Sequence, residues 1–118
     1  MRKELLIGFF KSLIVGMDGY QKINPEEAKS LMSQNCIILD VRMDYEYEEG
    51  HIANAVLLPV QEIEEKAESI LIDKDQLILV YCRSGQRSKK AAEKLIRKGY
   101  TNVKDFGGII QWPYEITK

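Results

Sequence analysis

Two short runs of this chain are apolar at every position, and they constrain its fold more than any other feature. The runs are residues 37–39, Ile-Ile-Leu, and residues 77–80, Leu-Ile-Leu-Val. A strand with one face in water alternates apolar and polar side chains, whereas a central strand of a parallel sheet is covered on both faces and is apolar throughout. We therefore interpret both runs as central strands of a mostly parallel sheet.

Helical patterns alternate with strands along the rest of the chain. Asn24, an N-cap residue followed by Pro25 and two acids, predicts a helix that runs to about Met32. Apolar periodicity and turn residues predict further helices near 43–49, 61–69 and 88–98, and strands near 21–23, 55–58 and 102–106, the last followed by a turn at Gly107 and Gly108. This alternation indicates βαβ units and an α/β fold.

The length of 118 residues suits one domain, because no repeat or Pro-, Gly- or Ser-rich linker divides the chain. We predict a folded domain at residues 19–118 and an N-terminal extension at residues 1–18. The extension is apolar at helical spacing, which favours an amphipathic helix on a cytoplasmic protein. Its basic start leaves an export signal as the alternative, although Glu4 and Lys11 interrupt the apolar stretch and no A-x-A-like cleavage site follows. The stretch is too short to span a bilayer, so we expect no membrane span.

Charge and cysteine content narrow the function further. The formal net charge of −1 provides no overall attraction for nucleic acid, so we expect no nucleic-acid partner. Of the two cysteines, Cys36 belongs to a buried strand and Cys82 precedes a loop, which is not the pattern of a disulfide framework. With one histidine and no C-x-x-C spacing, they do not indicate a metal site either. Free thiols fit a reducing compartment such as the cytoplasm.

The segment 82–88 follows the second apolar strand and leads into the last helix. Ligands of parallel sheets bind at the carboxyl ends of the strands, where Cys82, Asp40 and Arg42 are all expected. The first N–H groups of a helix lack intrahelical partners and attract anions, and Gly85 allows the backbone to approach closely. These surroundings favour the thiolate of Cys82, which is its reactive form.

Two arginines accompany this cysteine at the start of the helix, where acidic residues are normally preferred. Arg83 and Arg87 therefore indicate that an anion binds there. The alternative is that Cys82 is a small buried core residue and that the arginines are merely solvated.

Three segments in order resemble the rhodanese family, over about residues 23–112. The active-site loop of that family is similar to Cys82, Arg83, Ser84, Gly85, Gln86, Arg87 and Ser88. Its upstream signature is similar to Leu39-Asp40-Val41-Arg42, Glu46, Gly50-His51-Ile52, Ala55 and Leu58-Pro59. Its C-terminal turn resembles Gly107-Gly108 followed by Trp112.

The resemblance implies a rhodanese-like three-layer α/β/α fold with about five mostly parallel strands and helices on both faces. It also implies a sulfurtransferase that takes a sulfane sulfur from thiosulfate or a low-molecular-weight persulfide. Cys82 would hold this sulfur as a persulfide and pass it to a thiol, to cyanide or to a sulfur-carrier protein. The rest of the loop, 83–88, would bind the substrate, and Asp40 and Arg42 would shape the floor of the site by pairing with neighbours. No metal or organic cofactor is implied.

Two other functions stay open. Cysteine-dependent phosphatases also place a nucleophilic cysteine in an anion-binding loop that ends in arginine. Here four residues separate Cys82 from Arg87, whereas related dual-specificity phosphatases have one more, which widens the ring for a phosphoryl group. The second alternative is a non-catalytic binding module, but such modules have lost the cysteine. His51 is interpreted as a hydrogen-bonding residue rather than as a catalytic base.

Overall fold

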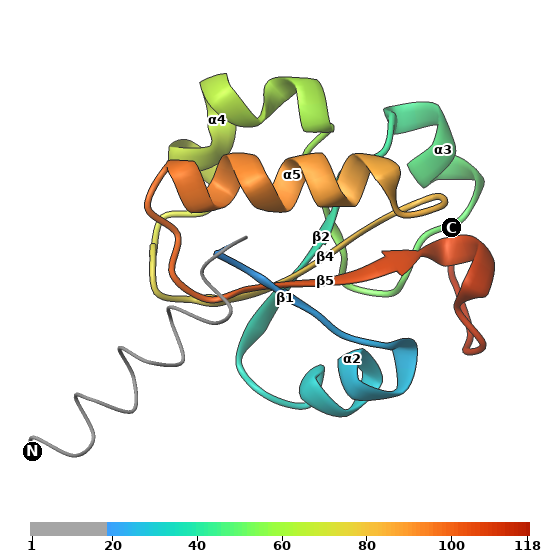
Figure 1. Ribbon diagram of the computed structural model, residues 1–118. Coiled ribbons are helices and arrows are strands. Elements are labelled where there is room, and N and C mark those ends of the chain that lie inside the picture. The colour runs from blue at the N-terminus through green and yellow to red at the C-terminus, as the bar shows by residue number, and fades with distance from the viewer. Residues whose placement is uncertain (1–18) are drawn as a thin grey trace, which may run out of the picture.

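Five parallel strands form the centre of the computed structural model, which describes residues 19–118 (Figure 1). Their order across the sheet is β1-β5-β4-β2-β3, and every neighbouring pair is parallel. The strands are β1 (Gln21–Lys22), β2 (Cys36–Asp40), β3 (Val56–Leu57), β4 (Leu77–Cys82) and β5 (Val103–Gly108). The predicted α/β fold with a parallel sheet is confirmed.

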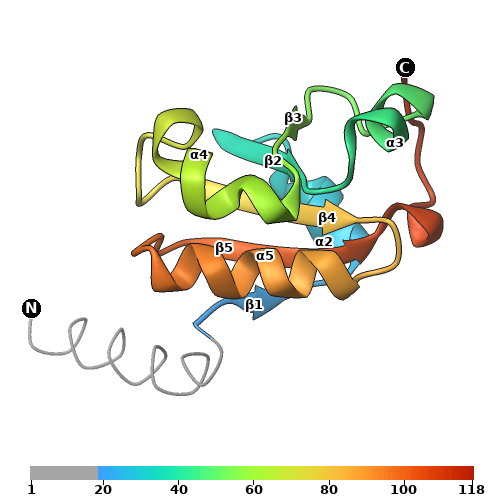
Figure 2. The same cartoon turned by 90° about the horizontal axis from the view of Figure 1, so that it is seen from above.

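Helices cover both faces of this sheet. They are α2 (Pro25–Leu31), α3 (Asp44–Glu49), α4 (Ile63–Ile70) and α5 (Gln86–Arg97), with 3₁₀ turns η1 (Val60–Glu62) and η2 (Ile109–Gln111). Seen from above, α4 and α5 lie over one face and α2 lies behind the other (Figure 2). Helix α2 starts where the sequence predicts, because a capping box forms there. The side chain of Asn24 accepts a hydrogen bond from the Glu27 amide, and the side chain of Glu27 accepts one from the Asn24 amide.

The central strand β4 is buried at all six positions, which explains its unbroken apolar sequence. On one face, Ile78 and Val80 pack in a core cluster with Ala91 and Leu95 of α5. On the other face, Leu79 and Tyr81 belong to a second cluster, which includes Ala28 of α2, Phe106 and Trp112. The two cores hold β4 rigidly, and its last residue is Cys82.

The end of β5 differs from the prediction. The strand was expected to stop at Phe106, but it continues through Gly107 and Gly108, and Gly108 pairs with Cys82 after a register shift. Gly108 has extended backbone and is not a turn residue. Its glycine is needed for close approach, because a Cβ there would overlap the carbonyl oxygen of Arg83 and lie 2.7 Å from the Cα of Ser84.

The amphipathic helix predicted for residues 1–18 lies outside the described residues. Between residues 19 and 118, no helix is long and apolar enough to cross a membrane.

Candidate functional site

Cys82 lies where β4 ends and its loop begins, and it is only 1% exposed. The chain turns back at Gly85, whose φ of +107° is in the left-handed region that favours glycine. This turn directs the amide of Gly85 toward the cysteine, to which it donates a 3.0 Å hydrogen bond at Sγ. Helix α5 starts at the next residue, so the sulfur lies beside a helix N-terminus, as predicted.

The rest of the loop divides into an outer and an inner part. Arg83, Ser84 and Gln86 are exposed, whereas Ser88 is fully buried. The hydroxyl of Ser88 donates to the carbonyl of Gly85 at 3.1 Å, which ties the first turn of α5 to the loop. The loop therefore keeps a fixed base and presents polar side chains to solvent.

The two arginines of the loop have different surroundings. Arg87 donates two hydrogen bonds to the carboxylate of Glu46 on α3, at 2.7 and 2.9 Å. The bond from Arg87 lowers the pKa of the Glu46 carboxyl from 4.5 to about 2. In the described part of the chain, the guanidinium of Arg83 makes no ion pair. Sequence analysis did not find this role of Glu46, because nothing local marks a partner 41 residues away.

Asp40 and Arg42 form a buried ion pair at the end of β2, 2.7 Å between Arg42 Nη2 and Asp40 Oδ2. Arg42 Nη2 also donates to the carbonyl of Gly50 at 2.7 Å. The hydroxyl of Tyr81 donates to Asp40 at 2.6 Å and accepts from the amide of Ile52 at 3.1 Å. Burial, together with the bond to Asp40, raises the pKa of Tyr81, so its hydroxyl keeps its proton.

This cluster ties β2, β4 and the segment around residue 50 together at the carboxyl ends of β2 and β4, one residue before Cys82. Asp40 and Arg42 pair with neighbours, and their role in shaping the floor of the site stays a prediction; Tyr81 was missed. Its signal was available: it is a polar group in an otherwise apolar strand, next to the cysteine.

The end of β5 and the turn that follows it contact the start of the loop. Asp105 is fully buried, and its Oδ1 accepts from the amide of Gly107 at 2.9 Å. The amide of Ile110 donates to the carbonyl of Arg83 at 3.2 Å, beside the close approach of Gly108. The start of the loop is therefore held by backbone contacts, and no local pattern in the sequence predicts the bond between Asp105 and Gly107.

His51 and Cys36 lie apart from the loop contacts. His51 Nδ1 is 2.7 Å from the carbonyl oxygen of Tyr47, and its ring stacks on the Tyr47 ring with centroids 3.6 Å apart. This is the hydrogen-bonding environment that the sequence favoured. Cys36 starts β2, at the opposite end of the sheet from the carboxyl end of β4, where Cys82 lies. In residues 19–118, no His, Cys, Asp or Glu side chains are grouped so that they could hold a metal ion.

Several known proteins are similar to this chain. The profile of the rhodanese-like domain matches residues 24–113. Thiosulfate sulfurtransferase GlpE of Coxiella burnetii is 37% identical over 95 residues, covering 79% of this chain and 87% of that protein. The crystal structure of a rhodanese-related protein from Thermoplasma volcanium has a TM-score of 0.74 and 32% identity, covering 83% of this chain and 98% of that one.

Similar sequence also occurs within longer proteins of other activities. A tRNA uridine(34) hydroxylase from Streptococcus uberis is 33% identical over 93 residues, 75% of this chain but 28% of that protein.

Proposed function

This chain belongs to the rhodanese-like domain family, and from that premise we propose that it is a sulfurtransferase in which Cys82 carries a sulfane sulfur. One observation carries the proposal: the Cys82 sulfur accepts a hydrogen bond from the Gly85 amide at the N-terminus of α5. The neighbouring Arg83 makes no ion pair within residues 19–118. A negatively charged sulfur is stabilised by such an amide, by the helix dipole and by nearby cations.

The reaction has two balanced steps. The Cys82 thiolate attacks the outer sulfur of thiosulfate, a Cys82 S–S bond forms, and sulfite leaves with the electron pair of the broken bond. The acceptor, such as cyanide or a thiolate, then attacks the outer sulfur of the persulfide. That sulfur leaves with the acceptor, and the electron pair returns to Cys82 Sγ. Neither step needs an external oxidant or reductant.

We assign a separate role to each group of residues around Cys82 from the contacts that it makes. The backbone amides of the loop hold the outer sulfur in this proposal, because the Gly85 amide donates to Cys82 Sγ and the first amides of α5 have no intrahelical partner. Arg83 captures the anionic donor, because its guanidinium is exposed and forms no ion pair with any described residue. Arg87 positions the loop by its bonds to Glu46, and Asp40 with Arg42 fixes the end of β2 beside the end of β4.

The domain at residues 19–118 contains this whole machinery, and residues 1–18 form an extension that the reaction does not require. The free thiols favour a cytoplasmic protein. The phosphatase alternative is less favourable, because both Nη atoms of Arg87 are held by Glu46 rather than left for a phosphoryl group.

Mass spectrometry of the intact protein tests the proposal. After exposure to thiosulfate, the wild-type protein and Cys36→Ser should each gain the mass of one sulfur atom, and cyanide should remove it. Cys82→Ser should gain none while keeping the circular dichroism of the folded protein. An equal gain in Cys82→Ser would contradict the assignment, and so would hydrolysis of p-nitrophenyl phosphate without any sulfur transfer.

A further inference from the structure

Helix α5 carries an excess of positive charge although the whole chain is slightly acidic. It contains five basic residues and one acidic residue, while the formal net charge of the chain is −1. Part of this charge is used internally. Arg87 bonds to Glu46, Lys94 Nζ to the Val60 carbonyl at 3.4 Å, and Lys98, just after the helix, to Glu68 at 3.2 Å.

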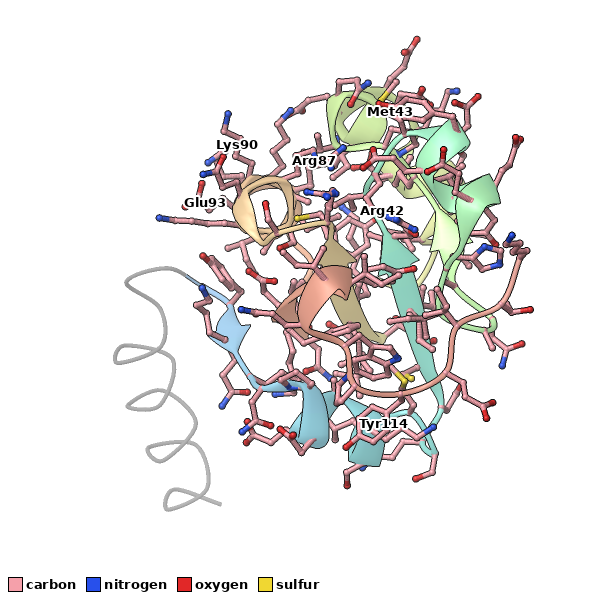
Figure 3. All side chains as sticks on the ribbon, turned by 90° about the vertical axis from the view of Figure 1, so that its right-hand side faces the viewer. Arg42, Met43, Arg87, Lys90, Glu93 and Tyr114 are labelled. Carbon is pink, nitrogen blue, oxygen red and sulfur yellow. The ribbon has the colours of Figure 1, made fainter. Side chains whose placement is uncertain are left out.

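The remaining charge lies on the outer side of the helix. Lys89, Lys90 and Arg97 are exposed, as is Arg83 in the loop, and none of the four side chains makes an ion pair within residues 19–118. We call these four residues the α5 basic strip. Figure 3 shows Lys90 and Glu93 extending away from the body of the protein, whereas Arg87 lies on the side of α5 that faces Arg42.

The strip is too long for a small donor. Helix α5 has 12 residues, so at about 1.5 Å per residue it extends roughly 18 Å from the Cys82 loop. Thiosulfate can contact only the end of the strip that is formed by Arg83. Lys89, Lys90 and Arg97 lie farther along the helix, where a chain of several residues could reach them.

Two exposed apolar side chains flank the same loop. Tyr45 of α3 is 60% exposed and lies next to Glu46, which binds Arg87, and Ile110 is 59% exposed and its amide binds the carbonyl of Arg83. Tyrosine and aliphatic side chains such as these are available for contact with a protein partner. The loop therefore has apolar flanks and a basic approach along α5.

We propose that the α5 basic strip docks an acidic segment of a partner protein, and that a thiol next to this segment is the acceptor of the sulfur on Cys82. This inference rests on the proposed function. The acceptor thiolate attacks the outer sulfur of the Cys82 persulfide and forms a new S–S bond. The bond to Cys82 Sγ breaks, and its electron pair returns to Cys82.

A protein fits this surface better than RNA does. The neighbouring helix α3 presents the exposed carboxylates of Asp44, Glu48 and Glu49, and Glu93 interrupts the strip itself. A continuous phosphate backbone would be repelled at these positions, because like charges at an interface oppose binding. A protein can place separate carboxylates against the cations and avoid the acids.

The test uses two synthetic peptides that share one cysteine and differ only in having four glutamates or four lysines beside it. The full-length protein is first loaded with sulfur from thiosulfate, and the single-turnover rate of transfer to each peptide thiol is then measured. Lys89→Glu/Lys90→Glu is compared with Lys22→Glu/Lys29→Glu, which makes the same charge change at β1 and α2 (Figure 2). Transfer to 2-mercaptoethanol, a small uncharged thiol, reports the chemistry alone.

We expect Lys89→Glu/Lys90→Glu to slow transfer to the acidic peptide by about tenfold or more at low salt. The same variant should transfer sulfur to 2-mercaptoethanol at the wild-type rate. Its rate of transfer to the basic peptide should rise. The control pair should behave as the wild type. The difference should shrink at high salt, because exposed charges are screened.

The docking proposal is overturned if both double variants transfer equally well to the acidic peptide, or if the Lys89 and Lys90 changes affect only the binding of a uridine homopolymer. Docking is measured apart from the chemistry by titrating a fluorescein-labelled acidic peptide onto Cys82→Ser and onto each double variant that also carries Cys82→Ser. If no sulfur is loaded from thiosulfate, the proposed function fails at that earlier step. If loading succeeds and the labelled peptide binds both double variants equally, only the docking proposal fails.

Discussion

Cys82 has two arginine neighbours in its loop, and their guanidinium groups have different surroundings. Glu46 holds Arg87 with two hydrogen bonds, which offset its charge and fix its direction. Arg83 is exposed, and its guanidinium bonds to no described residue, so it can reach a docking anion. The two residues should therefore affect different steps of the reaction.

Arg83→Ala should raise the KM for thiosulfate about tenfold, the effect of losing one charge-assisted contact of about 1–2 kcal/mol. On the proposed mechanism the kcat should change much less, because Arg83 serves donor binding there and the backbone amides hold the transferred sulfur. Steady-state kinetics with thiosulfate and cyanide measure both constants, and the KM effect should shrink at high salt. Lys29→Ala, a charge loss on the far side of the sheet, is the control. A fall in kcat at unchanged KM would contradict this division.

Glu46 should make the protein sensitive to acid. Its pKa is lowered to about 2 in the folded state, mainly by the bond from Arg87. A lowered pKa gives stability that is fully present above the unfolded pKa near 4.5 and is lost as the pH falls toward 2. Because Arg87 is one-third exposed, we expect a contribution of about 1–2 kcal/mol.

Urea unfolding of the wild type and Glu46→Gln at several pH values measures this contribution. The wild type should be more stable at pH 7, and the difference should disappear between about pH 4.5 and pH 2. A difference that stays constant over that interval would mean that the carboxylate charge is not the cause.

At the scale of the element, the strands and helices with a strong local signal were predicted from the sequence. The unbroken apolar runs identified β2 and β4, and the Asn24 cap with Pro25 identified the start of α2. These features depend on neighbouring residues, so the sequence shows them directly. The position of Cys82 at the end of β4 follows from the same local pattern.

Features that depend on distant contacts were not predictable. Gly107 and Gly108 looked like a turn, because glycine has no local preference that distinguishes a turn from a close backbone approach. The Glu46–Arg87 bond and the Tyr81–Asp40 bond each join residues 41 positions apart. The sequence pointed to Asp40, Arg42 and Glu46 near the loop, but not to Tyr81 or to the bonds that these residues make.

Gly108 gives a prediction for β5. Gly108→Ala should push the loop at Arg83 and Ser84 away from its position, because the new Cβ would overlap the Arg83 carbonyl. We expect a loss of kcat of about tenfold or more and a destabilisation of about 1–3 kcal/mol, typical of overpacking. Gly99→Ala is a matched control: it adds strain at a φ of +97° near the end of α5, away from the loop. It should lower stability and leave kcat unchanged, and equal kcat losses in both variants would contradict the role of Gly108.

At the scale of the whole molecule, the proposed division of the chain at residue 19 can be tested by truncation. A protein that begins at Gly19 should keep its rate of sulfur loading within about twofold, because the complete loop and sheet remain. A protein that begins at Asn24 lacks β1 and the buried Tyr20, and should lose about 2–4 kcal/mol of stability.

Thermal unfolding and thiosulfate loading of both truncated proteins provide the measurements. If the protein that begins at Gly19 is folded but no longer takes up sulfur from thiosulfate, residues 1–18 are required for the reaction.

The position of β1 in the sheet has a consequence for protein synthesis. Among the strands of residues 19–118, β1 pairs only with β5, and Gln21 lies 83 positions before its neighbour Lys104. At roughly 5–20 residues per second, β1 waits roughly 4–17 s on the ribosome before its partner strand is made. During that interval β1 has no strand to pair with, so its backbone N–H and C=O groups stay bonded to water until β5 is made.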